Sequence, residues 1–450
     1  MPPRCSGTFH EGHTYHFCCG QGRGRRRARG RGGVVAAAWQ RDRAPAISRG
    51  AALGLRWLPW HAGAVIQALR QALSSRAEPM LALLERLVNL NSFTDNPRGG
   101  DAVGEVLANE LSTIPGLCVR RFASARYAAH WVAESEAAKA SPAGHVALVG
   151  HLDTVFPPGV FEGFRLDGEL ARGPGVLDMK GGLVVVIEAL RALERIGALS
   201  AIPVRFAIVA DEEVGSPEGR PLLQRELAGA ACALVFEAGR EGDRIITARK
   251  GTGGATVRAT GKAAHAGNAH RQGANAIWAL ARFVDRAQQL TDYGRGVTVN
   301  VGKVSGGQGR NTVPDAAEAQ VDLRFVSRAD GEAMLAALAA AAREAAAEVP
   351  GTAVQVEGEI ARSPLARTDA SAALCREYAA CARAAGLGDA EAPLLGGGSD
   401  ASSTAEIGIP SIDGLGPRGS GFHTKDELVE VGTLVPKAEA LAAFLLGRRA

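Results

Sequence analysis

Apolar residues recur at two different spacings along the first half of the chain. Residues 64–90 carry them every three or four positions with one interruption, which predicts two short helices. Short runs rich in Val, Ala and Ile follow at 144–150, 202–213 and 232–239, and a helical stretch at 181–197 lies between the first two. Strands that alternate with helices predict an α/β domain with a mainly parallel sheet.

The order of the expected elements changes after residue 243. The pattern predicts a strand, a helix, two strands, a helix and a strand, at 253–261, 274–290, 297–307, 316–327, 331–349 and 353–360. This is the split βαββαβ order of a ferredoxin-like domain. We therefore expect an Arg/Gly-rich extension at 1–62, a catalytic α/β domain in two parts at 63–242 and 359–450, and an inserted βαββαβ domain at 243–358.

Composition agrees with an ordinary globular protein of two domains. The chain has 450 residues, 46% of them hydrophobic, and lacks the run of about 18 apolar residues that a membrane span needs. The formal net charge of +4 depends on six arginines at 23–33. Such a block can bind nucleic acid, but a disordered extension, a translation start placed too early or an export signal explains it as well. We therefore expect no nucleic-acid partner, and the missing apolar run predicts no membrane partner. Seven scattered cysteines, an odd number, favour reduced thiols and a cytoplasmic location.

Polar residues that end buried strands are the first candidates for chemistry, because ligands of open α/β sheets bind beyond the carboxyl ends of the strands. Taken singly, each has a plain explanation: a histidine there is often structural, an Asp can cap a helix, and a Glu pair can be solvated. Their conjunction favours a metal site instead. The candidates are His151 with Asp153, Asp178, Glu212 with Glu213, Glu237 and His423.

The types of these side chains indicate which metal is involved. Imidazole and carboxylate together suit zinc, and also cobalt or manganese. Two histidines and three carboxylates exceed what one tetrahedral ion needs, whereas two ions bridged by one carboxylate use them all. Two ions about 3.5–4 Å apart can hold a hydroxide between them and polarise a carbonyl, while an uncoordinated carboxylate moves protons.

Eight motifs resemble, in order, those of the dinuclear zinc peptidase family that includes glutamate carboxypeptidase, aminoacylase, acetylornithine deacetylase and succinyl-diaminopimelate desuccinylase. They are GHLDTVF, GPGVLDMKGG, ADEEVGS, VFEAG, GKAAHAG, RNTVPD, GGGSDAS and FHTKDE. The resemblance covers about residues 75–445 and is strongest to the glutamate carboxypeptidase branch. One departure is Ala238, which stands where the family has proline.

The resemblance implies a role for each candidate near the metals. His151 and Glu237 would complete one metal site, Glu213 and His423 the other, and Asp178 would bridge the two zinc ions.

Two further catalytic roles follow from the same resemblance. Glu212 would be the general base and acid, and Asp153 would orient His151. The family also implies that the inserted domain is a dimerisation or lid domain. It would pair two subunits of a homodimer, and His265 would reach into the partner's site and stabilise the oxyanion. An ordinary loop histidine is the alternative for His265.

The remaining implied residues would hold the carboxylate of the substrate. Asn311 and Arg324 resemble the family's polar pair, and an Arg fork suits a carboxylate. Gly398 and Ser399 would add backbone amides. Strand alternation alone would also explain Arg324, and a plain turn would explain the glycines.

The implied activity is metal-dependent hydrolysis of an amide next to a free carboxylate, through a metal-bridged hydroxide. The substrate would be a peptide or N-acyl-amino acid, cleaved by a carboxypeptidase that releases C-terminal glutamate or a similar amino acid. An N-acyl-amino-acid deacylase, of the acetylornithine deacetylase or desuccinylase type, is the alternative. A non-catalytic binding protein on the same fold would be expected to lack a ligand or the base, and this sequence has all of them.

Overall fold

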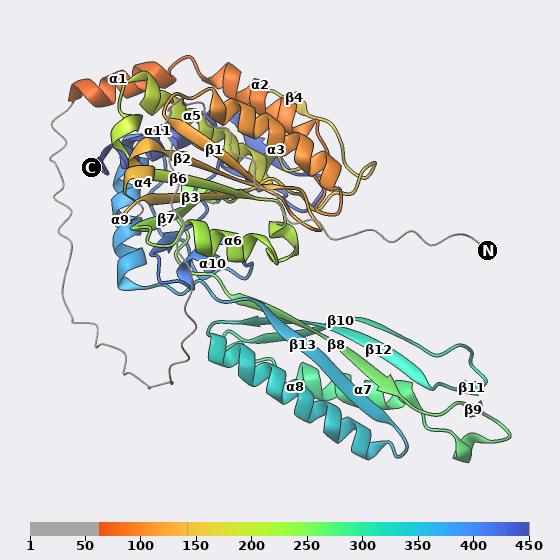
Figure 1. Ribbon diagram of the computed structural model, residues 1–450. Coiled ribbons are helices and arrows are strands. Elements are labelled where there is room, and N and C mark those ends of the chain that lie inside the picture. Colours follow the sequence, from red (N-terminus) through yellow and green to blue (C-terminus); the bar gives the residue numbers. More distant parts are fainter. Residues whose placement is uncertain (1–62, 142, 450) are drawn as a thin grey trace, which may run out of the picture.

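The computed structural model describes residues 63–141 and 143–449 (Figure 1). The α/β domain is built around a central six-stranded sheet, and an elongated second domain projects from the α/β domain (Figure 1). The expected extension at 1–62, with its Arg-rich block, lies outside the described residues. Among the described helices, none has the length and apolar character that crossing a membrane requires.

The six-stranded sheet of the α/β domain is mainly parallel, as expected. Its strand order is β1-β2-β6-β3-β7-β14. The four strands from β6 to β14 are parallel to one another, whereas β2 runs antiparallel to both of its neighbours, β1 and β6. The strands are β1 (Leu117–Phe122), β2 (His130–Ser135), β6 (Val204–Val209), β3 (Val146–His151), β7 (Cys232–Val235) and β14 (Ser411–Ile412).

Helices cover both faces of this sheet and form a three-layered domain. Leu148 of β3 points into the larger core, whereas its neighbours Ala147 and Val149 point into the smaller one. The helices of the larger core include α1 (Gly63–Leu73), α2 (Ala77–Val88), α3 (Pro97–Ser112), α5 (Gly181–Arg195), α9 (Asp369–Ala384) and α11 (Leu434–Leu446). The smaller core packs under α6 (Gly219–Glu226) and α10 (Ala401–Ala405).

The second domain has the expected βαββαβ order. Its elements are β8 (Gly251–Thr260), α7 (Ala276–Gln288), β10 (Thr298–Gly306), β12 (Ala316–Phe325), α8 (Arg328–Glu348) and β13 (Ala353–Arg362). The strands form an antiparallel sheet in the order β10-β12-β8-β13, and both helices pack on one of its faces (Figure 1). Alternate residues such as Val321 and Leu323 of β12 face those helices and form a separate core. The domain boundaries at 243 and 358 stay predictions, and β13 runs on to Arg362.

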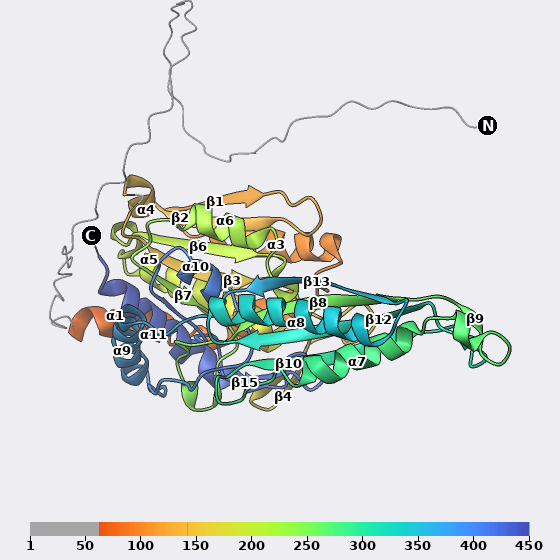
Figure 2. The same cartoon turned by 90° about the horizontal axis from the view of Figure 1, so that it is seen from below.

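A short strand pair extends the second domain away from the six-stranded sheet. β9 (Ala264–His265) and β11 (Thr312–Val313) pair antiparallel with each other. Both views place this pair at the tip of the domain, far from the α/β domain (Figures 1 and 2). His265 is the last residue of β9, and Asn311 directly precedes β11.

Candidate metal centre

The polar candidates come together at one edge of the parallel sheet. His151 is the last residue of β3, Glu237 follows β7, and Glu212 and Glu213 lie in a short turn after β6. The carboxyl ends of these three parallel strands meet at that edge, so residues distant in sequence become neighbours. Asp178 lies in the turn before α5, and His423 lies in the loop between β15 (Gly419–Ser420) and β16 (Leu428–Glu430).

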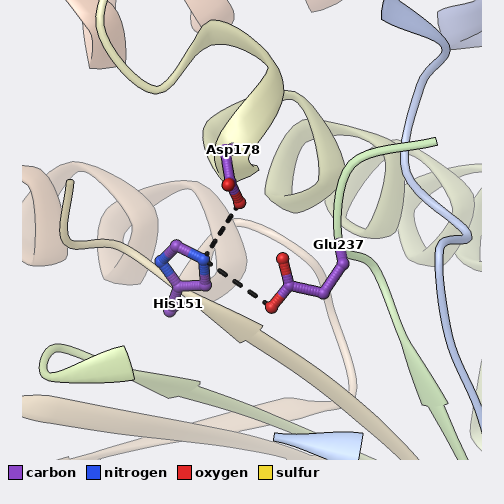
Figure 3. A group of neighbouring side chains, drawn as sticks. All are labelled: His151, Asp178 and Glu237. Atoms are coloured by element: carbon purple, nitrogen blue, oxygen red, sulfur yellow. Dashed lines mark ion pairs between the residues drawn. The ribbon is translucent and has the colours of Figure 1, made fainter. Parts of the chain in front are cut away.

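Three buried side chains form the first group (Figure 3). His151 directs Nε2 at two carboxylates, 3.4 Å from Oδ1 of Asp178 and 3.7 Å from Oε1 of Glu237. Ligand atoms that each lie about 2.1 Å from a tetrahedral ion are about 3.4 Å apart. The spacing of this group therefore suits a cation among the three side chains.

The second group shares Asp178 with the first. Nε2 of His423 lies 3.4 Å from Oδ2 of Asp178 and 3.1 Å from Oε2 of Glu213. His423 has a backbone φ of 63°, in the left-handed region that non-glycine residues seldom occupy. The two oxygens of Asp178 thus face two different groups, which is the arrangement a bridging ligand needs.

Burial shows that these residues fit metal ions. Nε2 of His151 and Oδ1 of Asp178 are buried without a hydrogen-bond partner among the described residues. Burial also raises the pKa of both Glu213 and Glu237 to about 7. Closely packed carboxylates are costly to ionise in such surroundings, and a bound cation removes that cost. The donor set of imidazole and carboxylate suits zinc, cobalt or manganese.

Asp153 links the histidine of the first group to the glutamate turn. Nδ1 of His151 lies 3.0 Å from the carbonyl oxygen of Asp153 and 3.4 Å from its carboxylate. The carboxylate accepts hydrogen bonds from Thr94 Oγ1 (2.8 Å) and from the backbone N–H groups of Glu212 (3.2 Å) and Glu213 (3.1 Å). The main chain of Asp153 thus orients His151, while its side chain holds the turn that carries both glutamates.

Glu427 supports the turn that carries Asp178 and was not among the predicted site residues. Its buried carboxylate accepts the backbone N–H groups of Gly175, Leu177 and Asp178, each at 2.9 Å. These bonds fix the turn that presents Asp178 to both groups. A sequence signal existed, since Glu427 is the last residue of the quoted motif FHTKDE.

We expect Glu427→Gln to loosen metal binding without unfolding the protein. A glutamine keeps one acceptor oxygen and turns an NH₂ group toward backbone donors, which costs about 1–3 kcal/mol for an unsatisfied group. Loss of such a supporting contact typically weakens metal affinity about 10–100-fold. Chelator competition measures the affinity, and Asp426→Asn on the exposed side of the same loop is the control. Equal chelator sensitivity of the two variants would show that Glu427 does not support the centre.

Glu212 belongs to neither group and contacts an arginine from the second domain. Nη2 of Arg362, the last residue of β13, lies 2.8 Å from Oε1 of Glu212 and donates to its carbonyl oxygen at 2.6 Å. Arg362 also pairs with Asp400 at 2.6 Å and donates to Ser216 at 3.0 Å. Burial raises the pKa of Glu212 to about 8, although Arg362 opposes the rise.

Arg362 and its partner Asp400 were not among the predicted site residues. Asp400 lies in the quoted motif GGGSDAS, so a signal was present. Arg362 ends an ordinary strand and lies in no motif, so only the folded chain reveals its position.

A cavity of about 1210 Å³ opens between the two domains at this edge. It is lined by residues of both groups, by Glu212, and by Arg324 and Gly398. Ser399 is fully buried, and its hydroxyl group donates to Asp413 at 2.6 Å.

The structure separates the residues expected to hold the substrate's carboxylate. Arg324 lines the cavity and pairs with Asp322 at 2.9 Å. Asn311 does not line it: its carbonyl oxygen accepts the N–H of Ala266, next to His265 in the β9–β11 tip. Within one chain, therefore, Asn311 and His265 lie together but apart from Arg324 and the metal-binding groups.

Known proteins share both domains of this chain. Residues 247–350 match the M20 peptidase dimerisation domain, and residues 132–283 match peptidase family M28. Carboxypeptidase G2 of Pseudomonas sp. (strain RS-16) is 31% identical over 386 residues, which cover 84% of this chain and 91% of that protein. The acetylornithine deacetylase of Myxococcus xanthus is 34% identical over 197 residues, 40% of this chain and 49% of the relative.

A solved structure shows the same fold. The M20 family metallo-carboxypeptidase Sso-CP2 of Sulfolobus solfataricus matches with a TM-score of 0.66 and 16% identity, over 82% of this chain and 98% of that one. Together with the identity to carboxypeptidase G2, this assigns the family that the eight motifs indicated. The chain belongs to the M20 family of dinuclear metallopeptidases and is a metal-dependent hydrolase of its peptidase and deacylase class.

Proposed function

We propose that this protein is a dinuclear zinc carboxypeptidase that removes a C-terminal glutamate or a similar amino acid from a peptide or N-acyl substrate. The observation that carries the proposal is the arrangement of carboxylates: Asp178 faces two metal-binding groups, while Glu212 lines the same cavity and joins neither. The likeness to carboxypeptidase G2 over most of the chain supports the choice of substrate class.

Each metal-binding group would hold one ion. His151 and Glu237 would bind the first, Glu213 and His423 the second, and Asp178 both. Bound zinc would polarise the scissile carbonyl and lower the pKa of water at the site. The carboxylates must be ionised to bind it, so ion binding would displace protons that burial holds on Glu213 and Glu237.

Glu212 would carry the proton from the attacking water to the leaving nitrogen. Burial favours its protonated form and the guanidinium of Arg362 favours its ionised form, so the two surroundings act on the pKa of the carboxyl group in opposite directions. Arg362 contacts Oε1, which fixes the orientation of the side chain. Glu212 would therefore both accept the proton of the water and donate it to the leaving nitrogen from a fixed position.

The carboxylate of the substrate would be bound by the second domain and by the glycine loop. Arg324 can offer a planar fork to it, and Gly396, Gly397 and Gly398 line the adjoining wall with backbone. Asn311 and His265 would complete the site from a second subunit, since they lie at the distant tip in their own chain.

A homodimer through the second domain supplies that second subunit. The match to the M20 dimerisation domain supports it, and β10 is an edge strand of the four-stranded sheet. Val304 on β10 and Ile277 and Trp278 on α7 are large apolar residues exposed in the isolated chain. Large apolar side chains exposed on an edge strand and on the helix that contacts it are typical of an interface.

The second candidate is an N-acyl-amino-acid deacylase, which the likeness to acetylornithine deacetylase favours. Both activities hydrolyse an amide next to a carboxylate, and the metal-binding groups serve either one. The candidates differ in the leaving amino acid: an acidic one for the carboxypeptidase, a basic one for the acetylornithine deacetylase.

Metal removal followed by reloading tests the proposal. We expect the chelated protein to be inactive and to regain activity with two zinc ions per chain, with cobalt or manganese as substitutes. The reloaded protein should hydrolyse N-acylglutamate and peptides ending in glutamate faster than N-acetylornithine or N-succinyl-diaminopimelate. Activity that survives chelation, or full activity with one ion per chain, would contradict the dinuclear mechanism, and preference for N-acetylornithine would select the deacylase.

A cytoplasmic location is also part of the proposal. Cys232, Cys375 and Cys381 are buried and form no disulfide within the described part of the chain. Cell fractionation checks the location, and recovery in an extracytoplasmic fraction would contradict it.

A further inference from the structure

The walls of the cavity carry four arginines, and three of them are paired with carboxylates of the protein. They are Arg249 with Asp413 at 2.6 Å, Arg324 with Asp322 at 2.9 Å, and Arg362 with Asp400 at 2.6 Å. The fourth is Arg240. Within residues 63–141 and 143–449 it forms no ion pair.

The guanidinium group of Arg240 forms a cation–π contact with the ring of Phe422. Its central carbon lies 4.8 Å from the centre of the Phe422 ring, and Phe422 is the neighbour of His423 in the second metal-binding group. Nε of Arg240 is buried and has no hydrogen-bond partner in the described structure. Nearby carboxylates act on the charge of Arg240 without forming an ion pair with it, namely those of Asp413, Glu237 and Asp178. Burying a cation without a direct partner is costly, and an anion that arrives with a ligand would reduce that cost.

Arg249 lies near both Arg240 and the glycine loop. Burial lowers the pKa of Arg240, and the nearby charge of Arg249 lowers it further. Nη1 of Arg249 in turn donates to the carbonyl oxygen of Gly397 at 3.2 Å. Arg240 and the loop 396–398 therefore line the same cavity, and Arg249 interacts with both of them.

Two anion-binding places in one cavity suit a ligand that carries two negative charges. In the proposed function the glycine loop and Arg324 bind the first carboxylate, and Arg240 lines the same cavity and offers a second place. We propose that Arg240 binds the side-chain carboxylate of the released amino acid and so selects a C-terminal glutamate or aspartate. This inference rests on the proposed carboxypeptidase function and adds the residue that decides between acidic and neutral amino acids.

The test compares two substrates of nearly identical shape, N-acylglutamate and N-acylglutamine, which differ in the charge of one side chain. For the zinc-loaded wild type we expect kcat/KM to be about 100-fold higher for N-acylglutamate than for N-acylglutamine, because Arg240 would pair with the charged side chain in a buried place. Arg240→Gln should lose about 100-fold on N-acylglutamate and change by less than about threefold on N-acylglutamine. Arg240→Lys keeps the charge and should retain part of the preference.

Arg244→Gln is the matched control, because Arg244 is exposed, lies in the same loop and does not line the cavity. It should leave both rates at their wild-type values. Equal losses on both substrates in Arg240→Gln would show that Arg240 only supports the loop and would overturn the inference. A wild type that cleaves both substrates equally well would also overturn it while leaving the carboxypeptidase function intact. A wild type that cleaves neither would refute the proposed function, and the inference with it.

Discussion

Glu212→Gln is expected to remove almost all turnover and to leave both metal-binding groups loaded. The substitution keeps the size of the side chain and the oxygen that meets Arg362, which lies 2.8 Å from Oε1. An amide cannot accept the proton of water at neutral pH or return it to the leaving nitrogen. General acid–base catalysis is worth about 10²–10⁴-fold, so a loss of kcat in that range is expected.

Metal analysis together with steady-state kinetics separates this role from that of the next residue. Glu213→Gln should lower the metal content, because its carboxylate belongs to the group with His423 and Asp178. Glu212→Gln should keep the metal and lose kcat with little change in KM. Near-normal turnover in Glu212→Gln would exclude it as the proton carrier, and loss of metal in that variant would make it a ligand.

His265→Ala is expected to give a folded, dimeric and nearly inactive protein. His265 is exposed at the tip of the second domain, so its removal costs the fold little. Its Nδ1 accepts the N–H groups of Gly267 (3.2 Å) and Asn268 (3.1 Å), which leaves Nε2 to carry the ring's hydrogen as a donor. Removing one oxyanion donor costs about 10²–10³-fold in kcat.

A mixture of two inactive variants tests whether that donor acts across subunits. In a dimer of one His265→Ala chain and one Glu212→Gln chain, the first chain keeps Glu212 and receives His265 from its partner. Half of the dimers in an equal mixture are of this kind and each has one complete site, so about a quarter of wild-type activity should return.

The mixing experiment has its own control. His270→Ala changes an exposed histidine in the same loop and should behave as the wild type. Mass spectrometry of isotope-labelled chains shows that the subunits have exchanged. Exchange without recovery would place the action of His265 within its own subunit or rule out its catalytic role.

The order of elements was predictable because burial imposes a period on the sequence. The antiparallel sheet of the second domain buries alternate residues on its helix-covered face, as in β8 and β12, so its strands were found close to their observed bounds. β1 was missed, since its sequence LCVRRF includes adjacent arginines and its residues are only partly buried. An edge strand of this kind is stabilised by its pairing with β2, which no local pattern records.

The sequence by itself indicated the fold class, the family and a candidate metal site. Polar residues directly after buried apolar runs lie at strand ends, which is why His151, Glu213 and Glu237 could be named as candidates from order and residue type, and the family resemblance then implied that they are metal ligands. The tertiary structure decided what surrounds them. In the folded chain Arg362 of the second domain contacts Glu212, and His265 lies at the tip of that domain. Arg240 lines the cavity and has no carboxylate partner among the described residues. These contacts join segments far apart in the chain, and their positions depend on how the elements pack.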